Sequence, residues 1–196
     1  MSTLTPPQSL NALILDDNED DIILLTSHLK QIDEYGITVS SSQTDEDAIR
    51  ILDSEPIDLI FCDYFLVDGS AEGFLHYTNR QGRHIPIILV SGLSERLVRY
   101  KGYQAGADAF LAKENLSPQT LVTAIESACF VSALRAQKTP SKQAQPRGED
   151  EQRRSALLEV VLQRMIDEVS HNIEGDILTA HNIIGKLKAI SREYSV

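Results

Sequence analysis

The fold is decided by the stretch IDLIFC at residues 57–62, an almost uninterrupted apolar run that Asp63 follows directly. A similar run, IPIILV, occupies residues 85–90 and leads into Ser91. Runs that are apolar at odd and even positions alike are typical of strands buried on both faces, as in a parallel sheet. The two runs therefore predict central strands of an α/β domain.

Outward from these runs, segments of two kinds alternate over the first 136 residues. Short apolar runs predict strands, and the segments between them have the spacing of amphipathic helices. The predicted strands cover residues 12–15, 38–40, 57–62, 85–90 and 109–111, and the predicted helices cover 20–32, 45–53, 71–80, 95–104 and 118–135. This alternation predicts right-handed crossovers and a doubly wound, five-stranded parallel sheet.

The net charge of the chain bears on whether DNA is a partner. The 196 residues include 18 Lys and Arg against 29 Asp and Glu, a net charge of −11, and 42% of them are hydrophobic, which is enough for a core. Residues 1–136 carry all the net acidity, while residues 151–196 hold 6 basic and 7 acidic residues. An acidic chain without a basic recognition helix argues against DNA as a partner.

Membrane and export are also disfavoured. No apolar stretch approaches the roughly 18 residues of a spanning helix, and MSTLTPPQSL at the start does not resemble a secretion signal. Cys62 and Cys129 lie inside apolar segments, so we interpret them as reduced core thiols of a cytoplasmic protein.

The rest of the chain changes character after residue 136. Residues 137–150 are rich in polar residues and contain two prolines, which predicts a linker, with a surface loop as the alternative. Residues 151–196 follow a heptad pattern. Its inner positions are Leu162, Ile166, Val169, Ile173, Asp176, Ala180, Ile183, Leu187 and Ile190. All but Asp176 are apolar, which predicts a long helix that pairs as a coiled coil in a homodimer. A helical hairpin turning at residues 174–176, or a stripe folded back onto the first domain, is the alternative.

Residues that could bind a ligand or take part in catalysis follow four of the five predicted strands, and the serines after the second strand offer nothing similar. Asp16 and Asp17 follow the first, Asp63 the third and Ser91 the fourth, and Lys113 follows the fifth. In parallel sheets these carboxyl ends form one edge, where ligands bind. Three acids there repel one another unless a cation lies among them, and an all-oxygen ligand set suits Mg²⁺. Asp63 is then placed to attack phosphorus, with the Ser91 hydroxyl and the Lys113 ammonium holding phosphoryl oxygens.

Simpler structural roles are also open for these residues. Asn18 starts a predicted helix, and we assign the acids behind it, Asp20 and Asp21, to that helix terminus alone. Ser91 with Gly92 is also compatible with a turn, and Lys113 with a surface position.

Four motifs together resemble the receiver domain of two-component response regulators, a flavodoxin-like fold, over residues 10–136. They are ILDD at 14–17, IDLIFCDYFL at 57–66, IILVSG at 87–92 and AGADAFLAK at 105–113. The resemblance implies that Asp63 is the phosphoacceptor, and that Asp16, Asp17, Asp63 and the Phe65 backbone carbonyl hold Mg²⁺. It also implies that Ser91 is the switch hydroxyl, that Lys113 contacts the phosphoryl group, and that Phe110 is the switch aromatic. A histidine kinase or a histidine phosphotransfer protein is the implied donor. Val67 and Glu114 stand where the family often has proline.

The segment VSHNIEGDILTAHNIIGKL at residues 169–187 resembles the phosphoacceptor region of histidine-kinase dimerisation helices, which implies a second phosphosite at His171. Asn172 and Asp176 depart from that pattern. Because no nucleotide-binding segment follows, we expect no kinase activity and no conventional enzyme. The leading hypothesis is a response regulator that signals through its C-terminal segment. The second is a phosphorelay protein or truncated hybrid kinase that uses His171. A dehalogenase-type phosphatase is disfavoured, because Phe65 stands where those enzymes have an acid.

Overall fold

A five-stranded parallel sheet forms the centre of the first domain. The computed structural model describes residues 8–33, 35–67, 69–81, 84–92, 96–138 and 156–163. The strands are β1 (Gln8–Leu15), β2 (Tyr35–Ser42), β3 (Leu59–Cys62), β6 (Ile87–Ser91) and β7 (Ala109–Ala112). They pair in parallel in the order β2-β1-β3-β6-β7, which confirms the predicted doubly wound, flavodoxin-like sheet.

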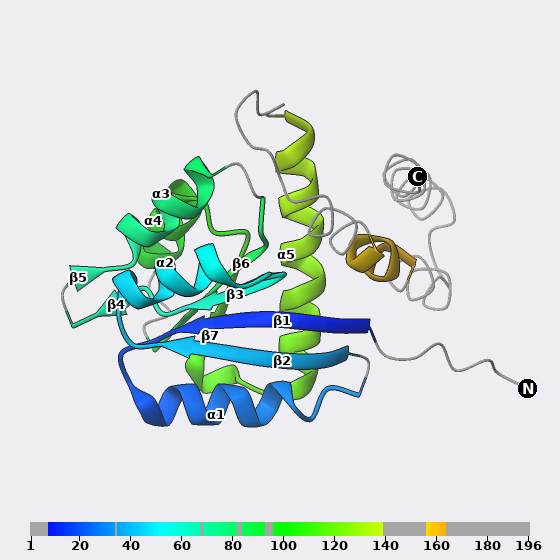
Figure 1. Ribbon diagram of the computed structural model, residues 1–196, viewed down its shortest axis with the longest axis horizontal. Coiled ribbons are helices and arrows are strands. Elements are labelled where there is room, and N and C mark those ends of the chain that lie inside the picture. The colour runs from blue at the N-terminus through cyan, green and yellow to red at the C-terminus, as the bar shows by residue number, and fades with distance from the viewer. Residues whose placement is uncertain are drawn as a thin grey trace, which may run out of the picture. The chain divides into compact units, whose positions relative to one another are not determined.

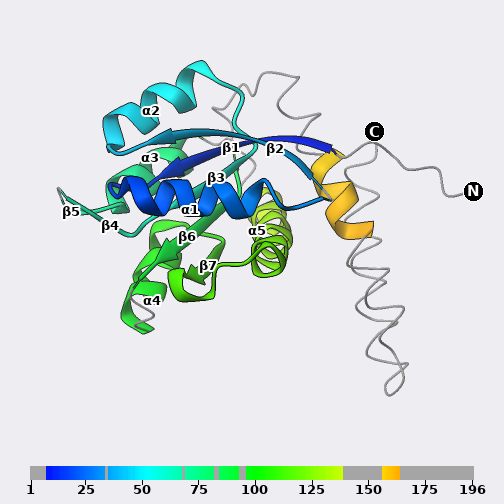
Figure 2. The same ribbon diagram turned by 90° about the horizontal axis from the view of Figure 1, so that it is seen from below.

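Helices cover both faces of this sheet. They are α1 (Glu19–Leu29), α2 (Asp45–Ser54), α3 (Glu72–Arg80), α4 (Arg96–Ala105) and α5 (Pro118–Lys138). The α1 and α5 helices lie on one face, and α2, α3 and α4 lie on the other (Figures 1 and 2). Each crossover between parallel strands is right-handed, so the direction in which the chain moves along the sheet decides which face the connecting helix covers. The chain moves one way from β1 to β2 and the other way from β2 to β3, β6 and β7, so α1 lies on one face and α2, α3 and α4 lie on the other.

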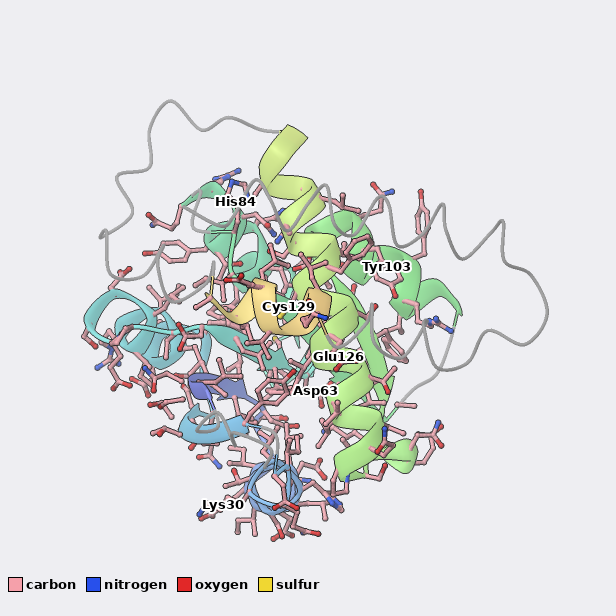
Figure 3. The ribbon with its side chains drawn as sticks, turned by 90° about the vertical axis from the view of Figure 1, so that its right-hand side faces the viewer. Lys30, Asp63, His84, Tyr103, Glu126 and Cys129 are labelled. Carbon is pink, nitrogen blue, oxygen red and sulfur yellow. The ribbon has the colours of Figure 1, made fainter. Side chains whose placement is uncertain are left out.

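The two central strands are buried at every position, which is why their sequences are apolar throughout. The α5 helix contributes two buried side chains that Figure 3 labels, Glu126 and Cys129. Both Cys62 and Cys129 are free, buried thiols, and burial raises the pKa of each, so they are packing residues of the core.

Two aspartates close the sheet at the amino ends of its strands. The Asp58 carboxylate, just before β3, accepts a hydrogen bond of 2.9 Å from the backbone N–H of Asn11. The Asp108 carboxylate, just before β7, accepts one of 3.0 Å from the backbone N–H of Ile87. In return, each aspartate donates its own backbone N–H to the carbonyl of the same partner at 2.8 Å. These carboxylates therefore satisfy backbone donors where the ladder begins.

A partly buried polar group, here called the amino-end network, joins Asn79, Gly106, Asp108 and Arg135. The Arg135 guanidinium donates to the Asn79 side-chain oxygen and the Gly106 carbonyl at 2.6 Å each, and to the Asp108 carboxylate at 3.1 Å. Burial raises the pKa of Asp108 to about 7, although Arg135 acts to lower it. The network fixes α5 to the amino edge of the sheet.

The observed elements differ from the predicted ones mainly at their ends. The β2 strand runs over residues 35–42 rather than 38–40, because it pairs with β1 along that whole length. A short antiparallel ribbon of β4 (Phe65–Leu66) and β5 (Gly69–Ser70) was not predicted. Figure 1 shows this ribbon at the edge where the parallel strands end. Two residues are too few for a period of two to be recognised.

The chain divides into two compact units, residues 1–145 and 146–196, and the division falls within the predicted linker. In the second unit residues 156–163 are helical. The buried side chains of this helix are Leu157, Leu158, Val161 and Leu162.

Most of the predicted heptad helix lies outside the described residues. Leu162 is the one inner position within them, and His171 is not among them. The coiled coil, the dimer and the second phosphosite therefore stay predictions. Across the described ranges, no helix is long and apolar enough to span a membrane.

Candidate functional site

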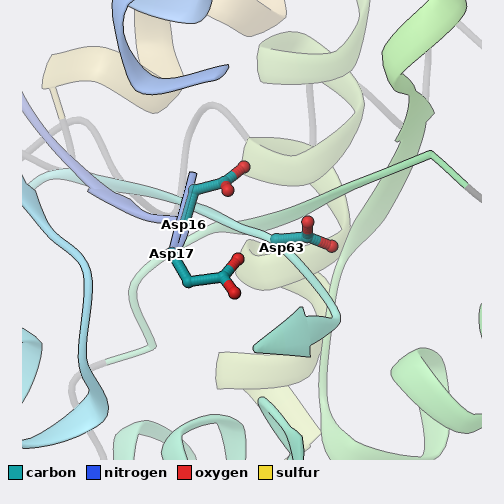
Figure 4. A group of neighbouring side chains, drawn as sticks. All are labelled: Asp16, Asp17 and Asp63. Atoms are coloured by element: carbon teal, nitrogen blue, oxygen red, sulfur yellow. The ribbon is translucent and has the colours of Figure 1, made fainter. Parts of the chain in front are cut away.

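Three carboxylates meet at the carboxyl edge of the sheet. Asp16 and Asp17 directly follow β1, and Asp63 directly follows β3, which is the neighbouring strand. One carboxylate oxygen from each lies within 4.8 Å of the others. Figure 4 shows the Asp16 and Asp17 side chains extending from the chain toward the side on which Asp63 lies. The predicted convergence of these residues is therefore observed.

Lys113 joins this group from the end of β7. Its Nζ lies 2.8 Å from Asp16 Oδ2 and 2.7 Å from Asp63 Oδ2. The lysine begins a 3-10 turn, Lys113–Asn115, and its side chain is 18% exposed. We call Asp16, Asp17, Asp63 and Lys113 the carboxyl-end cluster.

Two of the carboxylates that bind Lys113, those of Asp16 and Asp63, are held in the same way. Asp16 accepts the Asn18 backbone N–H through Oδ1 at 3.0 Å, and Asp63 accepts the Phe65 backbone N–H through Oδ1 at 3.1 Å. The opposite oxygen of each faces Lys113. A short turn after each strand therefore fixes the carboxylate, so the arrangement is set by the local backbone.

Burial and hydrogen bonding shift the pKa values of Asp16 and Lys113 in opposite directions. Burial raises the pKa of Asp16, although the hydrogen bond from Lys113 acts to lower it. Burial alone would lower the pKa of Lys113, but its hydrogen bonds to Asp16, Asp21 and Asp63 raise it above the ordinary lysine value. The ammonium therefore stays charged at neutral pH.

Asp21 is a contact residue that the sequence analysis missed. Its carboxylate lies 2.7 Å from Lys113 Nζ, from the first turn of α1. The predicted cap is also present, since Asn18 accepts the Asp20 backbone N–H at 3.0 Å. An acid in a first helical turn is explained fully by the helix dipole, so no sequence signal distinguished Asp21 from Asp20.

The other two predicted side chains, Ser91 and Phe110, lie on β6 and β7 of the same sheet. Ser91 is the last residue of β6 and is fully buried, and it has interactions within the protein. Phe110 lies in β7, with the Arg99 guanidinium of α4 stacked 5.2 Å from its ring centre. The switch roles of both residues, and the Phe65 carbonyl as a ligand, stay predictions. Val67 is 83% exposed, and no peptide bond within the described residues is cis, so Glu114 follows Lys113 through a trans bond.

The residues present fit a hard divalent cation. The donor set consists of carboxylate oxygens, which suit Mg²⁺. Four carboxylates, those of Asp16, Asp17, Asp21 and Asp63, lie around or beside one ammonium, so negative charge is in excess. A divalent cation among Asp16, Asp17 and Asp63 would offset that excess.

The family is decided by a match to the model of the response regulator receiver domain, which covers residues 12–126. The chain belongs to the response regulator receiver domain family. Its receiver domain carries the four motifs on which the resemblance rested, and its sheet has the expected topology.

Two curated relatives show how far the likeness extends. The probable transcriptional regulator ycf27 of Cyanidium caldarium is 30% identical over 115 residues, which is 59% of this chain and 44% of that protein. The TorCAD operon transcriptional regulatory protein TorR of Escherichia coli O157:H7 is 30% identical over 132 residues, which is 67% of this chain and 54% of that protein. The chain thus spans about half the length of these relatives.

A solved structure shares the fold. A putative response regulator from Chloroflexus aurantiacus J-10-fl superimposes with a TM-score of 0.55 at 22% identity, over 62% of this chain and 97% of that one. The likeness covers nearly all of the solved chain, as expected for a receiver domain followed here by further residues.

Proposed function

We propose that this protein is a two-component response regulator in which Asp63 accepts a phosphoryl group from a histidine kinase or a histidine phosphotransfer protein. The observation that carries the proposal is the Lys113 ammonium, hydrogen-bonded to both Asp16 and Asp63 with Asp17 beside them. A buried, fixed carboxylate next to a cation is the arrangement that phosphoryl transfer to an aspartate needs.

In the proposed step, one Asp63 oxygen forms a bond to phosphorus while the N–P bond of the donor phosphohistidine breaks. The backbone N–H of Phe65 holds Asp63 Oδ1, so the carboxylate is oriented before the donor arrives. Lys113 is within reach of the phosphoryl oxygens, because it already contacts Asp63 Oδ2 at 2.7 Å. The protein supplies position and positive charge, which are the main requirements of this reaction.

Asp16, Asp17 and Asp63, with the Phe65 carbonyl, are the proposed ligands of Mg²⁺. When bound, the cation neutralises charge on the phosphoryl oxygens. Asp16 and Asp63 keep their Oδ1 atoms on backbone N–H groups, so their orientation does not depend on the cation.

For the output, we propose that phosphorylation repositions Ser91 and Phe110 and changes the surface around β7. Phe110 already contacts Arg99 of α4, so a new rotamer would break that cation–π contact. The shift would bias how residues 151–196 pair in a homodimer, or which partner they meet. We propose a cytoplasmic protein whose C-terminal segment does not itself bind DNA, because that segment is nearly neutral.

The phosphorylation proposal is tested with acetyl phosphate and Mg²⁺, followed by intact-mass and site-mapping spectrometry. The wild type should gain one phosphoryl group at Asp63 that is lost in base, and Asp63→Asn should gain none. Asp20→Asn, which changes an exposed acid, is the matched control and should label normally. A label of equal size on Asp63→Asn would overturn the proposal. A label that survives base and maps to His171 would instead support the phosphorelay alternative.

The dimer proposal is tested by light scattering of the full chain beside an Ile173→Asp, Ile183→Asp double variant. Both residues are inner heptad positions, so charges there should disrupt pairing and reduce a dimer to a monomer. Equal masses for the two proteins would contradict the coiled-coil dimer. Retention on a DNA affinity matrix would contradict the absence of DNA binding.

A further inference from the structure

All three N–H donors of the Lys113 ammonium are used, each by a different carboxylate. An ammonium group has three donors and no acceptor. They go to Asp16 Oδ2 at 2.8 Å, Asp21 Oδ2 at 2.7 Å and Asp63 Oδ2 at 2.7 Å. The lysine is therefore held from the end of β1, the first turn of α1 and the end of β3.

The three carboxylates are not equivalent. Asp16 and Asp63 also belong to the group of oxygens that fits a divalent cation, whereas Asp21 is not part of that group as found over the described ranges. A divalent cation competes with Lys113 for the shared carboxylates and repels its ammonium. Asp21 is the partner whose attraction for Lys113 that competition leaves intact.

Asp21 is itself well placed to hold the ammonium. It lies in the first turn of α1, where the Asn18 side chain caps the helix and the Ile22 backbone N–H donates to the Asn18 carbonyl at 3.1 Å. Its side chain is 28% exposed, so its charge is only partly screened by solvent. The contact joins residues that are 92 positions apart in the sequence.

Resting on the proposed phosphorylation of Asp63, we propose that Asp21 is a positioning residue for Lys113. It holds the ammonium beside Asp63 when a divalent cation and then the phosphoryl group engage the two shared carboxylates. Asp21 thereby acts on the reaction through Lys113 and is not a ligand of the cation.

The test compares Asp21→Asn with Asp20→Asn in the full chain. Both variants remove one acid from the same helical turn, so they share any effect on the helix dipole. At saturating Mg²⁺ and acetyl phosphate, Asp21→Asn should label about fivefold more slowly, the scale of one charge-assisted hydrogen bond to a partly exposed ammonium. Asp20→Asn should label at the wild-type rate, and Asp21→Glu, which keeps the charge, should recover part of the loss.

Calorimetric titration with Mg²⁺ separates positioning from metal binding. Asp21→Asn should change the Mg²⁺ affinity by less than about twofold, whereas Asp17→Asn should weaken it by about tenfold or more. An equally large loss of affinity in Asp21→Asn would make Asp21 a ligand and overturn the proposal. Unchanged or faster labelling of Asp21→Asn would also overturn it.

A third measurement does not depend on phosphorylation. In the unphosphorylated protein at saturating Mg²⁺, where the cation engages Asp16 and Asp63, the ¹H–¹⁵N signal of the Lys113 ammonium should be protected from exchange with water in the wild type and in Asp20→Asn. It should lose that protection in Asp21→Asn, and retained protection would overturn the proposal. If the wild type fails to label, the phosphorylation proposal fails, while the ammonium signal still decides whether Asp21 positions Lys113.

Discussion

Each end of the sheet carries a cation that contacts carboxylates, but the balance of charge differs between the two ends. At the amino end, Arg135 meets the Asp108 carboxylate and two neutral oxygens, so one positive charge offsets one negative charge. At the carboxyl end, Lys113 meets three carboxylates, and Asp17 adds a fourth nearby. The amino-end network is balanced, whereas the carboxyl-end cluster has negative charge left over.

The carboxylates differ in exposure in the same way, but the two cations do not. The Asp108 side chain is 1% exposed against 9% for Asp63, whereas Arg135 is 26% exposed against 18% for Lys113. A network with balanced charge stabilises the fold. An unbalanced cluster carries a cost in charge repulsion that a bound cation removes, as is usual for functional sites.

The largest expected effect comes from removing each cation in turn. Arg135→Met leaves a buried carboxylate without its partner and should lower the free energy of unfolding by about 3 kcal/mol. Lys113→Met should lower it by about 1 kcal/mol without Mg²⁺, because the carboxylates that it leaves behind are more exposed than Asp108, and millimolar Mg²⁺ should restore the loss. Urea unfolding with and without Mg²⁺ measures both. Equal rescue of the two variants by Mg²⁺ would remove the distinction between the two ends.

A smaller effect is expected from one glycine at each end. At Gly106, where φ is +105°, an added Cβ would lie 1.9 Å from Asn79 Nδ2, so Gly106→Ala should cost about 2 kcal/mol of stability. At Gly92, beside Ser91, an added Cβ meets nothing within 4 Å, so Gly92→Ala should change stability by less than about 0.5 kcal/mol. Thermal unfolding of both variants decides this. A larger loss for Gly92→Ala would mean that the carboxyl end is the more tightly packed one.

The most gradual effect is a pH dependence that belongs to the amino end. Burial raises the pKa of Asp108 from 3.8 to about 7, so over this interval the folded protein keeps a proton that the unfolded chain has released. Stability from this group therefore falls as the pH rises from about 4 to 7 and is constant above that range.

Asp108→Asn removes the titrating group, so its unfolding free energy should fall less steeply over this interval, by at most about 1.4 kcal/mol per pH unit. The raised pKa of Asp16 acts in the same direction but is present in both proteins, so it cancels in the difference. Urea unfolding at several pH values is the measurement. Parallel profiles for the two proteins would show that Asp108 does not titrate in this range.

The sequence predicted the sheet and most of the cluster for a common reason. Buried parallel strands are apolar throughout, so the polar residue after each one marks its end, as Asp63 does after Cys62. Convergence of Asp16, Asp17, Asp63 and Lys113 then followed from topology alone.

What could not be predicted depends on contacts between distant residues. Asp21 had an adequate local explanation, and its pairing with Lys113 appears only once α1 and β7 are placed together. The Arg135 contacts with Asn79 and Asp108 likewise join separate elements, and no local pattern marks them. The β4–β5 ribbon was missed because two-residue strands have no detectable period.

Asp58 and Asp108, at the amino edge of the sheet, lie at the same sequence distance from the site residues at the opposite edge. Asp63 stands five positions after Asp58, and Lys113 stands five positions after Asp108. At about 3.3 Å per residue, each strand thus spans the same height of roughly 16 Å between an anchor and a reactive group. Inserting one residue into β3 would raise Asp63 by a step and turn its side chain to the other face of the sheet. The positions of Asp63 and Lys113 at the carboxyl edge therefore depend on the number of residues that separate them from the aspartates at the amino edge.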